Sequence, residues 1–178
     1  GRRNNKWFSV PNKSLTFSII LNQNKIKNKE LLSIMPAIAI TKAIEKNTHL
    51  QCAIKWPNDI MLNNKKIGGI LIETKFDYAV IGIGLNVNEN YNDLNTHIKN
   101  NSTSLRINKA PIIKLEILLA NILNVLEECC NQKNQNLINE WLNYCDHINK
   151  EIKFHQNNNI VSGIFKGINE KGQAIINI

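Results

Sequence analysis

The sequence predicts an α+β fold built from short strands and a few amphipathic helices. Four apolar, β-branched runs have the length of strands: residues 15–21, 60–62, 67–72 and 78–85. Two longer stretches, residues 29–46 and 111–130, repeat apolar side chains at helical spacing. After His147 alternating runs separated by turns predict a small antiparallel β unit: residues 151–155, 160–168 and 173–178.

Length and composition set the outer limits of this fold. The chain has 178 residues, of which 43% are hydrophobic, enough for one core and a small appendage. We find neither an apolar run of membrane-spanning length nor a signal-peptide pattern, and therefore expect a cytoplasmic protein without a membrane partner. Because the chain begins with Gly1 rather than Met, we expect a fragment of a longer protein.

Charge and cysteine content narrow the classes of partner. The net charge of +8 suits a phosphate-bearing ligand or an acidic partner. The lysines are scattered and form no basic helix face, so the charge does not predict a DNA-binding surface. The four cysteines include no Cys-x-x-Cys pair and no His/Cys cluster, so we expect reduced thiols and no metal site.

The N-terminal segment, residues 1–9, is polar, basic and glycine-led, and it precedes the first predicted strand. Arg2 and Arg3 in such a loop are suited to close over a phosphate or carboxylate, because a guanidinium binds these groups in a planar, bidentate way. Trp7 offers a flat face to a purine. The alternative is a solvated, arginine-rich arm that binds nothing.

The helical stretches indicate packing rather than chemistry. Residues 29–46 contain Pro36, which either kinks the helix or marks its true first turn. Residues 111–130 begin with a proline, a residue typical of the first helical turn, and carry an apolar stripe. Residues 137–144 predict a second, shorter helix.

Residues 55–73 are the most informative stretch, because two apolar runs flank a polar turn, as in a β-hairpin. Lys55 follows the apolar run at residues 52–54, a strand that Pro57 ends. A lysine at the mouth of a buried strand is costly unless an anion or a carboxylate meets it. Gly68 and Gly69 open the next strand, where glycines indicate close approach of a ligand or another backbone. The stretch therefore predicts a seat for a small acid. The alternative is an ordinary corner, with the lysine in water and a β-bulge at the glycines.

Asn86 ends the next predicted strand, and a long polar loop follows it to about residue 101. The short amide both donates and accepts hydrogen bonds, so it is suited to contact a polar ligand. The alternative is a turn asparagine without a binding role.

Three motifs in this order resemble the biotin–protein ligase family, the biotin–[acetyl-CoA-carboxylase] ligases: Lys-Trp-Pro-Asn-Asp at 55–59, Gly-Ile-Leu-Ile-Glu at 69–73 and Gly-Ile-Gly-Leu-Asn-Val-Asn at 82–88. The resemblance implies a mixed β-sheet with helices packed on one face, like that of class II synthetases, followed by an SH3-like β unit. It divides the chain into an N-terminally incomplete biotin/ATP-binding catalytic domain, residues 1–148, and an incomplete SH3-like domain, residues 149–178.

The resemblance also implies the reaction, in which ATP and biotin form biotinyl-5′-AMP and the biotin passes to a lysine of a biotin carboxyl carrier domain. It implies that Mg²⁺ accompanies ATP with few direct protein ligands. Carried over residue by residue, it makes Lys55 and Arg2 catalytic. The same two residues bind biotin with Gly68 and Gly69, and the adenylate contacts are Arg3, Trp7 and Asn86.

The N-terminal loop departs from the family pattern. Gly1, Arg2 and Trp7 fall on the later Gly, Arg and Trp of a loop that closes over the adenylate in the family. Asn4 and Asn5 stand where the family has Gly and Arg, so one phosphate contact is in doubt.

Two alternatives remain at this point: a lipoate-protein ligase-like enzyme, or a non-catalytic biotin-binding or regulatory fragment. The resemblance also suggests a homodimer formed by sheet extension, through residues 19–21 or 78–85 if either lies at an edge. It suggests DNA as a partner only if an N-terminal DNA-binding domain precedes this chain.

Overall fold

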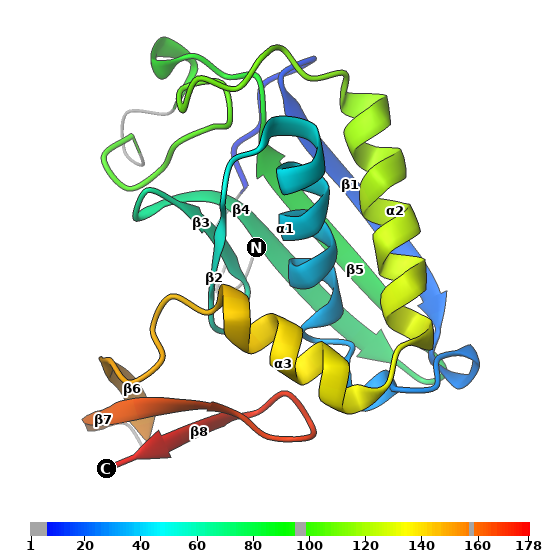
Figure 1. The fold of residues 1–178 in the computed structure, drawn as a ribbon, viewed down its shortest axis with the longest axis vertical. Helices are drawn as coiled ribbons and strands as arrows, with labels where there is room; N and C mark the ends of the chain where they lie inside the picture. The colour runs from blue at the N-terminus through cyan, green and yellow to red at the C-terminus, as the bar shows by residue number, and fades with distance from the viewer. Residues whose placement is uncertain (1–6, 95–98, 157–158) are drawn as a thin grey trace.

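The computed structural model describes residues 7–94, 99–156 and 159–178, and within them a five-stranded sheet lies against helices (Figure 1). The strands are β1 Ser14–Asn22, β2 Ala53–Lys55, β3 Asp59–Leu62, β4 Lys65–Lys75 and β5 Tyr78–Asn86, in the spatial order β1-β5-β4-β3-β2. The α+β class is confirmed. All four pairings in this sheet are antiparallel, whereas the expected sheet was mixed.

The predicted hairpin is β3–β4, and its turn explains its sequence. Asn63 and Asn64 both adopt positive φ, 50° and 61°, the backbone of a two-residue turn that asparagine tolerates well. The pairing shifts between Ile60 and Met61, so that Ile67 is an extra residue on β4. This bulge places Lys66 and Gly69, three residues apart, on the same face of the sheet.

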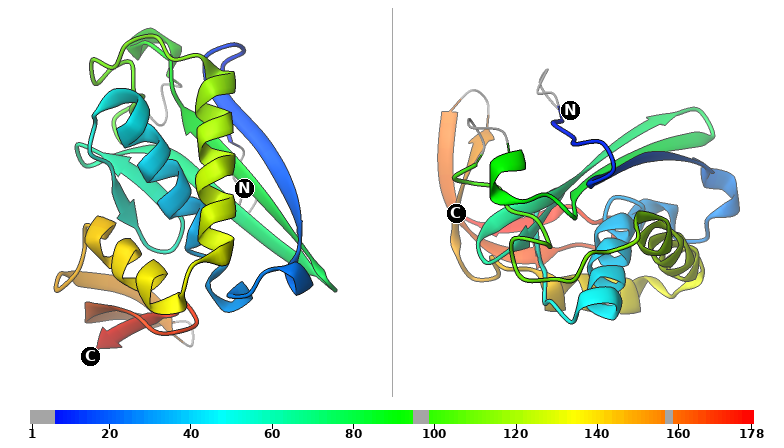
Figure 2. Two further views of the ribbon diagram at one scale, coloured as in Figure 1. Left: turned by 45° about the vertical axis from the view of Figure 1, so that its right-hand side comes forward. Right: turned by 90° about the horizontal axis from the view of Figure 1, so that it is seen from above.

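Three α-helices of the described residues pack together on one face of the sheet: α1 Met35–Thr48, α2 Leu115–Asn131 and α3 Asn134–Tyr144 (Figure 2). Pro36 lies in the first turn of α1, where its missing N–H has no helical partner to lose. Helix α2 begins at Leu115 rather than at Pro111, and Ile112 is 75% exposed. Short 3₁₀ turns cover Gln23–Lys25, Lys29–Leu31 and Tyr91–Asp93.

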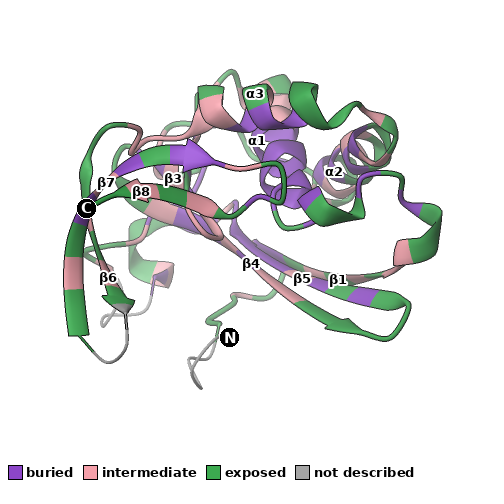
Figure 3. Ribbon diagram, turned by 90° about the horizontal axis from the view of Figure 1, so that it is seen from below, coloured by how far each residue is buried: buried purple, intermediate pink, exposed green. Residues whose placement is uncertain are grey.

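The two faces of the sheet differ in burial (Figure 3). Side chains on the helix face form one core with the helices, including the fully buried Ile38, Ile44, Ile60, Ile81 and Leu85. The part of the chain that the structure describes before β1, starting at Trp7, lies on the opposite face, away from the helices (Figure 2, right). We call this second face the open face.

The C-terminal β unit is present as predicted, as the antiparallel strands β6 Glu151–Gln156, β7 Asn159–Ile168 and β8 Ala174–Asn177. Phe165 of β7 is fully buried, and its ring centroid lies 6.3 Å from Trp56, 6.4 Å from Trp141 and 4.3 Å from His147. This small sheet therefore shares its core with the larger one. The domain boundary at residues 148 and 149 stays a prediction.

Strand order decides which edges are free for sheet extension. Strand β5 lies between β1 and β4, so residues 78–85, one of the two candidates for sheet extension, offer no free edge. Residues 19–21 belong to β1, which is an edge strand among the described residues. Among the residues that the structure describes, no helix has both the length and the apolar character that crossing a bilayer requires.

Candidate functional site

A hollow of about 910 Å³ lies on the open face, above the middle of the sheet. Its floor contains three glycines from neighbouring strands, Gly69 of β4 and Gly82 and Gly84 of β5. Around this floor stand mostly polar or aromatic residues, among them Trp7, Phe8, Asn58, Asp59, Lys66, Asn86 and Ser102. Because the glycines carry no side chains, a flat group is able to reach the backbone of the sheet.

The strand register aligns a row of residues through this hollow. Thr16 lies opposite Gly84, Gly84 opposite Gly69, Gly69 opposite Asp59, and Asp59 opposite Lys55. Directly opposite residues project from the same face of an antiparallel sheet. Lys55 therefore stands on the open face at the end of a row that crosses the glycine floor. Its side chain is exposed and is not among those that line the hollow.

Trp7 lies on the glycine floor. A Cβ atom built at Gly84 would overlap the indole ring, and one built at Gly69 would come 3.4 Å from Trp7 Cζ3. The indole therefore occupies space that exists because residues 69 and 84 are glycines. Trp7 therefore lines the hollow, and its contact with an adenylate stays a prediction.

The two adjacent glycines face opposite sides of the sheet. Gly69 faces the hollow, whereas a Cβ atom at Gly68 would come 2.9 Å from Leu85 Cδ1 and 3.2 Å from the Gly84 carbonyl oxygen. The absence of a side chain at Gly68 thus serves core packing. The biotin contact assigned to it stays a prediction, and this geometry favours Gly69.

Lys66 is the site residue that sequence reasoning missed. Its Nζ lies 2.5 Å from Asp59 Oδ1 and 6.0 Å from the centroid of the Trp7 ring. The sequence places this lysine in a polar turn, and only the bulge turns its side chain towards Gly69. In the sequence Lys66 lies three residues before Gly69, a spacing that places two residues on opposite faces of a regular strand. That spacing does not indicate the bulge.

Asn86 closes one end of the hollow and is 6% exposed. Its Nδ2 donates a hydrogen bond to the Thr103 carbonyl oxygen at 2.9 Å. Behind it, Ser14 Oγ donates to the Glu89 carboxyl, and Ser104 Oγ donates to the Glu89 carbonyl oxygen at 2.6 Å. Burial raises the pKa of Glu89, whose second carboxyl oxygen has no partner among the described residues. These bonds fix the end of β5 and hence the position of Asn86.

Arg2 and Arg3 lie outside the described residues, as do Gly1, Asn4, Asn5 and Lys6. The roles predicted for the two arginines therefore stay predictions. Of the sequence-predicted residues that the structure describes, Trp7, Gly69 and Asn86 line the hollow, and Lys55 stands in register with it.

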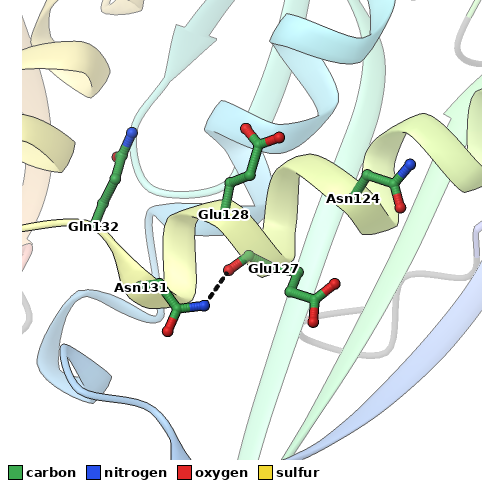
Figure 4. Close-up of a pocket in the computed structure, with 5 residues that line it drawn as sticks. All are labelled: Asn124, Glu127, Glu128, Asn131 and Gln132. Atoms are coloured by element: carbon green, nitrogen blue, oxygen red, sulfur yellow. Dashed lines mark hydrogen bonds between the residues drawn. The ribbon is translucent and has the colours of Figure 1, made fainter.

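A second, shallow hollow lies near the C-terminal end of α2 and is lined by Asn124, Glu127, Glu128, Asn131 and Gln132 (Figure 4). The two carboxylates point away from each other, and Asn131 Nδ2 donates to the Glu127 carbonyl oxygen at 3.1 Å. Over the described ranges, no three metal-binding side chains gather in one place. The hollow on the open face is therefore the stronger candidate site.

The described thiols do not supply a nucleophile. All four cysteines are free, as expected from the sequence. Burial raises the pKa of Cys52 and of Cys129 to about 12 and that of Cys145 to about 11. These thiols are therefore protonated at neutral pH.

Comparisons with known proteins agree with the motifs. The model of the biotin/lipoate A/B protein ligase family matches residues 1–88. The chain is 34% identical over 126 residues to the bifunctional ligase/repressor BirA of Bacillus subtilis, covering 64% of this chain and 39% of that protein. It is 25% identical over 185 residues to the protein of the same name from Escherichia coli, covering 99% of this chain and 57% of that one. The chain thus spans less than two thirds of the length of these two relatives.

Solved structures give the same result for the fold. The biotin protein ligase of Aquifex aeolicus, in complex with biotin and ATP, superposes with a TM-score of 0.87 at 27% sequence identity. The match covers 99% of this chain and 76% of the Aquifex chain.

Proposed function

This chain belongs to the biotin/lipoate A/B protein ligase family, and we propose that it is an ATP-dependent, AMP-forming biotin–protein ligase, a biotin–[acetyl-CoA-carboxylase] ligase. The observation that carries the proposal is the row of residues across the open face, in which a glycine floor leads to Lys55. Such a floor admits a flat ring, and the lysine provides a cation at one end for its carboxylate.

In the first step the biotin carboxylate attacks the α-phosphate of ATP. A bond forms between a carboxylate oxygen and phosphorus, the bond to the leaving oxygen breaks, and pyrophosphate departs with the electron pair. The carboxylate is already a competent nucleophile, so the protein has to position the reactants and stabilise negative charge. We assign that task to Lys55 and, from the undescribed loop, to Arg2. The protonated thiols fit a reaction without a covalent enzyme intermediate.

The remaining site residues hold the reactants. Gly69 lets the ring of biotin approach the backbone once the Trp7 indole moves off the glycine floor, and Asn86 offers a fixed amide that also lines the hollow. Trp7 stacks on or covers the adenine, and Arg3 contacts the adenylate. In the second step the amine of a carrier lysine attacks the mixed anhydride, its nitrogen bonds to the carbonyl carbon, AMP leaves, and the nitrogen loses a proton.

Mg²⁺ is part of the proposal only as an ion carried by ATP. Asp59 is the one carboxylate among the described residues that line the hollow, and Lys66 already holds it. The donor set of the described residues therefore does not fit an all-protein magnesium site.

The proposal includes a biotin carboxyl carrier domain as protein partner and a cytoplasmic location. The four free thiols support a reducing compartment. A homodimer through the edge strand β1 is compatible with the strand order.

The test is the formation of biotinyl-AMP from biotin, Mg²⁺ and α-labelled ATP. We expect the labelled adenylate with this chain and a loss on the order of 100-fold in Lys55→Ala, because a charge-stabilising group is removed. Lys153→Ala, an exposed strand lysine of β6, is the matched control and should react like the parent. Near-normal adenylate formation by Lys55→Ala would contradict the role of Lys55. Competition by lipoate stronger than that by biotin would favour a lipoate ligase instead.

A further inference from the structure

The open face contains two lysines and a single carboxylate in close proximity. Lys55 and Asp59 are directly opposite each other on β2 and β3, a position in which Cβ atoms are separated by only about 5 Å. An aspartate so placed is the natural partner of the lysine. Yet Lys55 has no carboxylate within 4.0 Å among the described residues, whereas Asp59 Oδ1 pairs with Lys66.

The pairing with Lys66 depends on local backbone geometry. The bulge at Ile67 turns the Lys66 side chain onto the open face, where it passes over Gly69. A Cβ atom at Gly69 would come 3.3 Å from both Cε and Nζ of Lys66. Because Gly69 has no side chain, the Lys66 side chain has room to extend across it to Asp59.

We propose that Lys66 is a positioning residue: by holding the Asp59 carboxylate, it keeps the Lys55 ammonium free to bind the anionic groups of the substrates. The proposal rests on the proposed function, because it explains how Lys55 stays available to a carboxylate and an α-phosphate. Without Lys66, the carboxylate opposite Lys55 would compete with the substrates for the same ammonium group.

The first test measures the availability of Lys55 without any substrate. The protein is acylated briefly with a small amine reagent at fixed pH, and the labelling rate of Lys55 is read by mass spectrometry. In Lys66→Met, Lys55 pairs with Asp59, and we expect its labelling to slow about two- to fivefold, the range for a solvent-accessible ion pair. Asp59→Asn should label like the parent, and the double variant Lys66→Met/Asp59→Asn should recover the parental rate. This recovery is the non-additivity expected of coupled sites.

Matched variants separate positioning from a general effect on structure. Lys66→Arg keeps the ion pair and should preserve the labelling of Lys55. Lys65→Met removes an exposed lysine from the preceding position of β4 and should leave that rate unchanged. An unchanged Lys55 rate in Lys66→Met, or a double variant as slow as the single one, would overturn the proposal.

The second test links availability to the reaction. In Lys66→Met we expect the KM for biotin or ATP to rise about two- to fivefold, with recovery in the double variant, since competition for Lys55 weakens anion binding. If the parent forms no biotinyl-AMP, the proposed function fails while the labelling result stands. If the parent forms the adenylate but Lys55 labels equally in all variants, the positioning role alone fails.

Discussion

The two faces of β5 carry opposite kinds of residue, although they alternate along the same strand. On the helix face Ala79, Ile81, Ile83 and Leu85 are buried in the core. On the open face the same strand presents Val80, Gly82, Gly84 and Asn86. One face thus fills its space with branched side chains and the other leaves space for a ligand. Stability and the candidate site therefore draw on different residues of one strand, so that substitutions should separate the two.

The largest expected effect is on the helix face. Ile81→Ala removes a fully buried side chain and leaves a cavity, which should lower the free energy of unfolding by about 2–5 kcal/mol. Val80→Ala, at the adjacent position on the open face, should cost about 1 kcal/mol or less. Urea unfolding at 25 °C measures both values. Similar losses of unfolding free energy in the two variants would show that the two faces contribute equally to stability.

Gly68 and Gly69 are adjacent in β4 but face opposite sides of the sheet. Gly68→Ala places a methyl group against Leu85 and the Gly84 carbonyl, and should lower the free energy of unfolding by about 1–3 kcal/mol. In Gly69→Ala the three atoms nearest to the new methyl group belong to the Lys66 and Trp7 side chains, which are able to move, so the free energy of unfolding should change by less than about 0.5 kcal/mol. Its effect should instead be weaker binding of biotin, measured by calorimetry. A strongly destabilised Gly69→Ala with intact biotin binding would reverse the two roles.

A smaller effect concerns the buried carboxyl behind the open face. Burial raises the pKa of Glu89, so the folded state keeps a proton that the unfolded chain releases near pH 4.3. Its contribution to stability is fully present below the unfolded pKa and is lost as pH rises through the folded pKa. Glu89→Gln, which stays neutral, should therefore be more stable than the parent at neutral pH, and this difference should shrink as the pH falls towards the unfolded pKa. Unfolding titrations from pH 4 to pH 8 test the sign, and a parent that gains stability over this range relative to Glu89→Gln contradicts it.

The strands and helices were largely predictable from local sequence, whereas the positions of the site residues depended on strand register. Alternation and turn residues such as Asn63 and Asn64 predicted the strands and the hairpin. Pro36 predicted either a kink or the true first turn of the helix, and the structure shows the first turn. The predicted start of α2 was wrong, because Ile112 fits the helical spacing but lies exposed before the helix begins at Leu115. The opposite orientation of Gly68 and Gly69 follows from strand alternation, but spacing did not show which of the two faces the hollow. The role of Lys66 did not follow from spacing either, because one extra residue in β4 moves its side chain to the face of Gly69.

The smallest effect on unfolding should come from Trp7, which touches the glycine floor yet belongs to the N-terminal segment. Trp7→Ala should change the free energy of unfolding by less than about 0.5 kcal/mol, because the indole is 37% exposed and lies outside the core. If Trp7 stacks on adenine, the same change should weaken ATP binding by about 5- to 100-fold, the range for aromatic stacking on a base. Phe76→Ala, an exposed aromatic at the β4–β5 turn, is the control and should alter neither quantity. Fluorescence titration with ATP and urea unfolding of the same samples separate binding from stability. Unchanged ATP affinity in Trp7→Ala would remove the tryptophan from the adenylate site and leave the glycine floor to a ligand of a different shape.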